Sequence, residues 1–184
     1  MNNIYGLYKQ SRNASWQCLI DHHVDRLPVQ ITRIVRLAGI RLVENGKVLK
    51  LAPHESGRSI YDGKHWAIIY DEEDTPQRCR FTIAHELGHI FLGHNTSGMY
   101  SVEEETAANV FASRLLAPAC VLWALDIHSA EEIKELCNIS ISAASIRAER
   151  MKILYARNKF LLSSLERQVY EQFQPFIQGK KAKM

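Results

Sequence analysis

The chain has 184 residues, of which 46% are hydrophobic and 23% are charged, and its formal net charge is +3. This composition is typical of a globular domain and excludes wholesale disorder. The longest apolar run, residues 115–125, contains Pro118 and is shorter than the roughly 20 residues of a membrane span. Lys180, Lys181 and Lys183 lie in the last five residues, so the rest of the chain is near neutral and shows no basic field for nucleic acid.

The cysteines and the first residues bear on the cellular compartment. The four cysteines stand far apart and form no CxxC pair, so neither a disulfide framework nor a zinc ribbon is expected. Residues 1–16 lack the charged start and the apolar core of a secretory signal. We therefore expect a cytoplasmic protein that neither enters a membrane nor binds nucleic acid directly.

The first third of the chain changes from helical to strand patterns. Residues 14–38 carry apolar side chains at helical spacing and predict two helices, which Pro28 separates. Within residues 40–70, turn dipeptides at Asn45-Gly46 and Asp62-Gly63 alternate with short β-branched or aromatic runs, at 40–43, 47–51, 59–61 and 66–70. These runs predict a small antiparallel β-sheet.

After Asp71 the pattern is helical. Thr75 can cap a helix that begins at Pro76 and should end at about residue 92, and a second helix is expected at about 102–116. Ser129 begins a further helical part, over 129–176, with capping-box spacing. This order predicts an α+β fold with one domain over residues 1–176, followed by a disordered basic tail at 177–184.

The sequence His85-Glu86-Leu87-Gly88-His89 carries the strongest chemical signal. On a helix, His85 and His89 lie one turn apart on the same face and can bind one zinc ion. Glu86 follows the first histidine directly, where it can act as general base towards zinc-bound water. We therefore predict a zincin-like metalloprotease domain in which residues 76–116 form the zinc helices.

A catalytic zinc ion keeps three protein ligands and one open place, so a third ligand is needed. The metzincin pattern would require histidine where the chain has Asn95, and it therefore fails. A carboxylate from the next helix is the other option, as in gluzincins. Glu105 is the first candidate, and Glu104 and His94 remain alternatives.

The helix face that carries Glu105 also carries Asn109 and the small residues Ala108 and Ala112. Small side chains would let this helix approach the histidine helix closely. Asn109 could then accept a hydrogen bond from the nitrogen of a ligating histidine that faces away from the metal.

These residues carry a family resemblance. Residues 80–89, which end in the HExxH motif, and residues 105–118, with Glu105, Ala108 and Asn109, together closely resemble the ImmA/IrrE family of metallo-endopeptidases. The resemblance implies zinc ligands at His85, His89 and Glu105, and a catalytic glutamate at Glu86. Many members carry a second acid two residues after the first, where this chain has Ala107.

The resemblance also implies a biological role. It implies a cytoplasmic, gluzincin-like zinc endopeptidase with one zinc ion, which cleaves a helix-turn-helix transcriptional repressor and so acts in transcription regulation. The alternative is a non-catalytic metal-binding regulator that acts by binding a repressor or a toxin partner. The oligomeric state stays open.

Three weaker signals complete the predictions. The run Trp66–Tyr70 is either a substrate-binding strand edge, through Trp66, Ile68 and Tyr70, or an ordinary core strand. Residues 130–150 resemble a helix-turn-helix, but the second helix begins with few polar reading groups, so a structural helix pair is favoured. The residue that stabilises the oxyanion is unassigned, with four candidates in the sequence: Tyr70, His94, His128 and Arg147.

Overall fold

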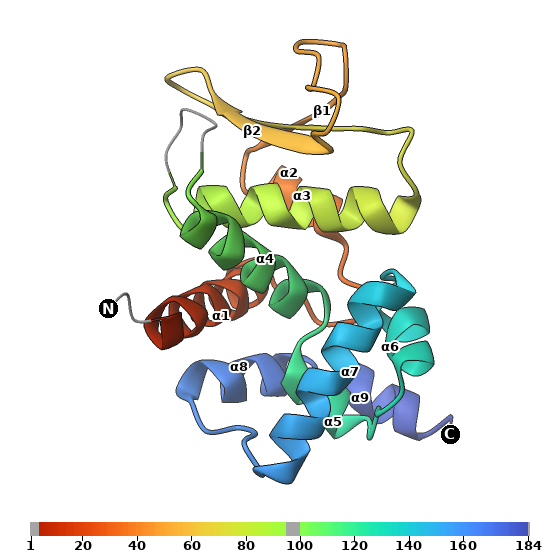
Figure 1. The fold of residues 1–184 in the computed structure, drawn as a ribbon. Helices are drawn as coiled ribbons and strands as arrows, with labels where there is room; N and C mark the ends of the chain where they lie inside the picture. Colours follow the sequence, from red (N-terminus) through yellow and green to blue (C-terminus); the bar gives the residue numbers. More distant parts are fainter. Residues whose placement is uncertain (1–3, 95–99, 184) are drawn as a thin grey trace. The chain divides into compact units, whose positions relative to one another are not determined.

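The computed structural model describes residues 4–94 and 100–183 (Figure 1). The chain divides into two compact units, one of residues 1–14 and 30–112 and the other of residues 15–29 and 113–184. Two of the boundaries fall inside helices, α1 (Ile4–Asp21) and α4 (Val102–Leu116), and the third, between residues 29 and 30, lies just before α2 (Ile31–Leu37). The sequence predicted one domain over residues 1–176, because a boundary inside a continuous helix leaves no linker composition to mark it.

The first unit contains a sheet of three strands, β1 (Arg41–Glu44), β2 (Gly57–Tyr61) and β3 (Trp66–Tyr70), in the order β1-β3-β2. β2 runs antiparallel to β3, and β1 runs parallel to it. The α+β class is thus confirmed, but the sheet is mixed and not antiparallel throughout.

The difference arises at residues 47–51, which were expected to be a strand and form none. The side chain of Asn45 accepts a hydrogen bond from the Leu51 backbone N–H at 2.9 Å, and the Gly46 N–H donates to the Leu49 carbonyl at 3.0 Å. These bonds hold the segment as a local loop after β1. Parallel strands need a long connection between them. The loop after β1 forms part of such a connection, and β1 therefore pairs in parallel with β3.

Helix α3 (Pro76–Phe91) packs against β2 and β3, and α2 (Ile31–Leu37) packs against α3 and β1. Figure 1 shows α3 running along one face of the sheet. The Thr75 side chain accepts a hydrogen bond from the Arg78 N–H, and Pro76 is the first helical residue, as predicted. The core between sheet and helix consists of fully buried aliphatic side chains, among them Ile68, Ile69, Ile83 and Leu87.

Helix α4 approaches α3 closely at Gly88. A Cβ atom at this position would lie 3.2 Å from the Cα atom of Ala108 and 3.1 Å from the ring of Phe111. Ala108, Phe111 and Ala112 are fully buried. The predicted close approach of the two helices is therefore present, and it depends on the missing side chain at Gly88 as well as on the alanines.

The second unit is helical, with α5 (Ala119–Ala124), α6 (Ala130–Cys137), α7 (Ile141–Ala156), α8 (Ser164–Gln172) and α9 (Gln174–Lys181). Ser129 and Glu132 form the predicted capping box of α6, and α6 packs against α7 as a helix pair. α9 extends to Lys181, and its Ile177 side chain is 2% exposed. Residues 177–181 were expected to belong to a disordered tail, but burial of Ile177 and Phe173 anchors this helix.

The stretch Val102–Ala124 has the length and hydropathy of a membrane span by composition alone. Its most apolar window is 72% buried within the protein, and a buried core helix passes the same test. Pro118 also divides the stretch into α4 and α5.

Candidate metal centre

The first unit brings His85 and His89 of α3 together with Glu105 of α4. The Nε2 atoms of the two histidines lie 3.0 Å apart. The Glu105 carboxylate lies 3.3 Å from Nε2 of His85 and 3.6 Å from Nε2 of His89. All three ligand atoms lie within 4.8 Å of one another. Ligands bound tetrahedrally at about 2.0–2.1 Å would lie about 3.3 Å apart, so this spacing fits one metal ion.

The other ring nitrogen of each histidine has its own partner. Nδ1 of His85 lies 3.1 Å from the side-chain oxygen of Asn109, and Nδ1 of His89 lies 2.9 Å from Nδ1 of His94. If Asn109 accepts, Nδ1 of His85 carries the proton, and its Nε2 presents a lone pair to the cluster. Asn109 thus has the position that the sequence predicted for it, and His94 occupies the matching position at His89.

Both histidines are held in the neutral form, which is the form that binds a metal. Burial, together with the neighbouring His85 and His94, lowers the pKa of His89 to about 3. Burial also lowers the pKa of His85, against the opposing effects of Glu105 and Asn109.

Glu86 is buried next to this cluster, with 5% of its surface exposed. Burial raises its pKa to about 7, although hydrogen bonds from the side chain and the backbone of Ser59 act in the opposite direction. Its Oε2 atom has no hydrogen-bond partner among the described residues. A buried carboxylate oxygen without a partner is costly, and it fits a site that receives a water or a metal.

Two residues of this site, Ser59 and Tyr100, were not predicted from the sequence. The Tyr100 hydroxyl lies 2.9 Å from Oγ of Ser59, and its ring stacks on the His89 ring with centroids 3.5 Å apart. Ser59 comes from β2, and Tyr100 precedes α4. The sequence offers one weak signal for Ser59, which is a polar residue in a predicted strand. In the structure its side chain is fully buried.

The alternative third ligands have other contacts. The Glu104 carboxylate accepts a hydrogen bond from the Ser101 N–H at 2.8 Å, and the Glu104 N–H donates to the Ser101 side chain. Glu104 therefore caps the start of α4. His94 contacts the far side of the His89 ring, so Glu105 alone of the three candidates reaches both Nε2 atoms.

The predicted substrate-binding edge at Trp66, Ile68 and Tyr70 is wrong. β3 is the central strand, and both of its edges are paired, with β1 and with β2. Ile68 is completely buried, and the Trp66 ring packs against Tyr61 at 5.0 Å between centroids. The run is therefore a core strand, and an alternation pattern alone does not distinguish a central strand from an edge.

The candidates for the residue that stabilises the oxyanion belong to different units of the chain. His94 lies beside the metal-binding cluster, and Tyr100 joins it there as a candidate that the sequence did not single out. His128 and Arg147 belong to the second unit, where His128 contacts Asp126 at 2.8 Å. The guanidinium of Arg147 is buried, with no hydrogen-bond partner among the described residues.

An HExxH helix on a small sheet, with an acidic residue from the next helix, defines a gluzincin-like arrangement of metal ligands. The family model Peptidase_M78, described as the IrrE N-terminal-like domain, matches residues 39–149. This match covers more than half of the chain, and the chain belongs to that metallopeptidase family. A comparison with curated proteins gave no match.

Proposed function

We propose that this chain is a zinc-dependent endopeptidase that hydrolyses a peptide bond in a protein substrate. The observation that carries the proposal is the convergence of His85, His89 and Glu105 beside the buried carboxylate of Glu86. Membership of a peptidase family supports the same chemistry.

The proposed metal is one zinc ion held by His85, His89 and Glu105. Two neutral imidazoles and one carboxylate are a ligand set of catalytic zinc sites that leaves a coordination place open. When bound, such an ion supplies a Lewis acid for the substrate carbonyl and a water whose pKa is lowered to about 7.

Glu86 is the proposed general base. The Oε2 atom of Glu86 is buried without a hydrogen-bond partner among the described residues, so this oxygen is available to accept a proton. A pKa of about 7 lets this carboxyl both accept and release a proton near neutral pH. Glu86 would take the proton of the attacking water and then pass it to the leaving amine.

The free edge of β2 is the proposed place for an extended substrate. The Asp71 N–H donates to the Ser56 carbonyl, and the Asp62 N–H donates to the His65 carbonyl. In an antiparallel pair, residues hydrogen-bonded to the partner strand alternate with residues that are not, so every second residue of β2 between positions 56 and 62 is not bonded to β3. The backbone groups of Gly57 and Tyr61 therefore point away from β3. In the described ranges β2 pairs with β3 alone, so its outer edge can take main-chain hydrogen bonds from a peptide.

We further propose that the protein substrate is a helix-turn-helix transcriptional repressor, the class that the family resemblance implies, and that the protein acts in the cytoplasm. The four cysteines, all among the described residues, form no disulfide, which agrees with a reducing compartment. The exposed edge of β2 supports a protein substrate in extended form, such as a linker between repressor domains.

The test compares the parent protein with Glu86→Gln, which removes the base and keeps the side-chain shape. Both are expressed in a host cell, and new protein N-termini are mapped by mass spectrometry. We expect a repressor fragment with the parent alone, while Glu86→Gln retains bound zinc. If Glu86→Gln relieves repression as fully as the parent without any cleavage, the non-catalytic regulator is the correct function.

A further inference from the structure

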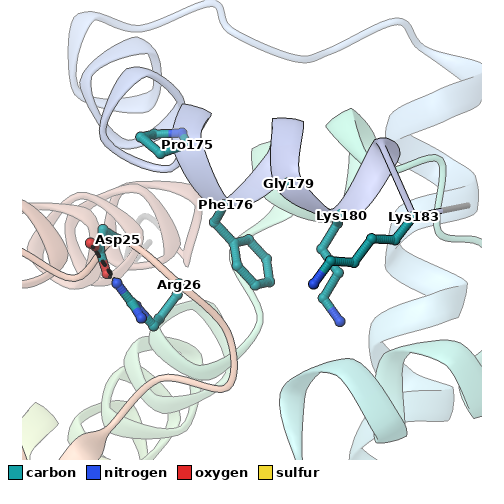
Figure 2. A pocket seen from close by; sticks show the side chains of 7 residues that line it. All are labelled: Asp25, Arg26, Pro175, Phe176, Gly179, Lys180 and Lys183. Atoms are coloured by element: carbon teal, nitrogen blue, oxygen red, sulfur yellow. Dashed lines mark hydrogen bonds and ion pairs between the residues drawn. The ribbon is translucent and has the colours of Figure 1, made fainter.

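A groove in the second unit lies between α9 and the segment Asp25–Arg26, and it has a volume of about 380 Å³ (Figure 2). Figure 2 shows the Phe176 ring projecting from α9 between the Asp25–Arg26 pair and the side chains of Lys180 and Lys183. The residues that line it lie outside 39–149, the part matched to the peptidase family. The groove is therefore not a feature of the matched family domain.

Internal contacts hold both walls of the groove in place. The side-chain amide of Gln172 donates to the carbonyls of Leu19 and Val24, at 2.8 and 2.7 Å, and so ties the end of α8 to the segment that leads into Asp25. The ring of buried Phe173 meets the Phe176 ring edge to face at 6.4 Å between centroids. The groove is thus preformed, as small-ligand sites are.

On the α9 side of the groove, an aromatic ring lies next to a glycine with open space beside it. Phe176 and Lys180 lie four residues apart on one face of α9, and Lys183 lines the groove from the turn that follows the helix. Gly179 lies on the same face, and a Cβ atom there would meet nothing within 4 Å. Glycine weakens a helix relative to alanine, so it is a costly residue at this position. Because Gly179 has no side chain, the surface beside the Phe176 ring has room for a flat ligand.

The charge of the groove is positive. Asp25 is paired with Arg26 at 2.9 Å, and Lys180 lies over the Phe176 ring at 5.8 Å. Lys180 and Lys183 form no ion pair with any residue in the described ranges. Two lysines and the Arg26 guanidinium, against one acid, favour a ligand with at least two negative charges.

We propose that this groove binds a nucleotide, with a planar base against Phe176 and Gly179 and a diphosphate against Lys180 and Lys183. Aromatic rings bind bases by stacking regardless of base identity, and lysine and arginine bind phosphate. A volume of about 380 Å³ suits a small ligand better than a folded partner. The site is separate from the proposed protease site and does not depend on it.

Isothermal titration calorimetry of the full chain with ADP tests this inference, with adenosine and pyrophosphate as fragment probes. We expect saturable binding of ADP with one site per chain, and binding of each fragment at least about tenfold weaker. Phe176→Ala should weaken ADP binding about tenfold, by loss of the stacking surface. Gly179→Leu should block the groove, and its thermal unfolding shows whether the helix is kept.

Lys181→Ala is the matched control for Lys180→Ala and Lys183→Ala. It removes the same charge from the same helix, but Lys181 does not line the groove. We expect Lys181→Ala to retain parental ADP affinity, while each of the other two lowers it about fivefold or more. Equal losses in all three variants, absent ADP binding, or tighter binding of an acidic peptide or a single-stranded oligonucleotide than of ADP would overturn the inference. Glu86→Gln should bind ADP like the parent, which separates this result from the protease test.

Discussion

Nδ1 of His94 lies 2.9 Å from Nδ1 of His89, so a residue just beyond the end of α3 contacts the ring nitrogen that faces away from the metal-binding cluster. If His89 donates this hydrogen bond, its Nε2 atom has a lone pair for the metal, and His94 carries its own proton on Nε2. His94 is then a positioning residue for His89, as Asn109 is for His85.

Replacing His94 by alanine should weaken zinc binding about 10–100-fold, because partners of ligating histidines contribute about this much to affinity. Competition with a chromophoric chelator measures the change. His128→Ala removes an exposed histidine of the second unit and should leave zinc affinity unchanged. A loss with His94→Ala as complete as with His89→Ala would instead make His94 a ligand.

Gly88→Ala should separate α3 from α4, because the added Cβ atom would meet Ala108 and Phe111 at 3.1–3.2 Å. We expect a loss of about 1–3 kcal/mol of unfolding free energy, together with weaker zinc binding as Glu105 moves away. Gly179→Ala makes the same change on α9, where the position is open, and should stabilise the protein by about 0.5–1 kcal/mol. Equal stability changes in the two variants would contradict the close helix contact.

The buried Glu86 should make the metal-free protein less stable at higher pH. Its pKa of about 7 lies above the ordinary value of 4.5, so the folded state favours the protonated carboxyl. This contribution to stability is fully present below the ordinary pKa and is lost as the pH rises through about 7. We compare the unfolding free energy of Glu86→Gln with that of the parent, both in the presence of a chelator. The advantage of Glu86→Gln should be on the order of 2 kcal/mol larger at about pH 8 than at about pH 5. Urea unfolding at both pH values measures this, and a pH-independent difference would exclude a raised pKa.

Tyr61→Pro tests the β2 edge as the substrate-binding surface. Proline removes a backbone N–H that points away from β3, so the sheet ladder should persist while a substrate hydrogen bond is lost. We expect kcat/KM for the cleaved repressor to fall about tenfold relative to Tyr61→Ala, which lacks the same ring but keeps the N–H. Equal kcat/KM values for the two variants would show that the substrate does not pair at this position.

Local patterns were enough to predict which side chains meet at the candidate metal centre. The spacing of His85 and His89, and the shared helix face of Glu105 and Asn109, depend only on helical periodicity, and the structure places these four side chains together. The start of α3 at Pro76 was equally predictable, because a cap is a local interaction.

Features that depend on contacts distant in sequence were not predictable. β1 pairs in parallel with β3 because residues 47–51 fold into a loop around Asn45, which no alternation pattern shows. Tyr100 and Ser59 meet across 41 positions in the sequence, and neither residue type alone indicates a role beside Glu86. The two-unit organisation was hidden for a similar reason, since two of its three boundaries lie within continuous helices.

The zinc K-edge X-ray absorption spectrum of the protein loaded with one equivalent of zinc tests the central claim most directly. We expect four-coordinate zinc with nitrogen and oxygen ligands at about 2.0–2.1 Å, two imidazole signatures, and loss of one imidazole in His85→Ala. A spectrum with sulfur ligands, or one unchanged by His85→Ala, would contradict zinc binding by His85, His89 and Glu105.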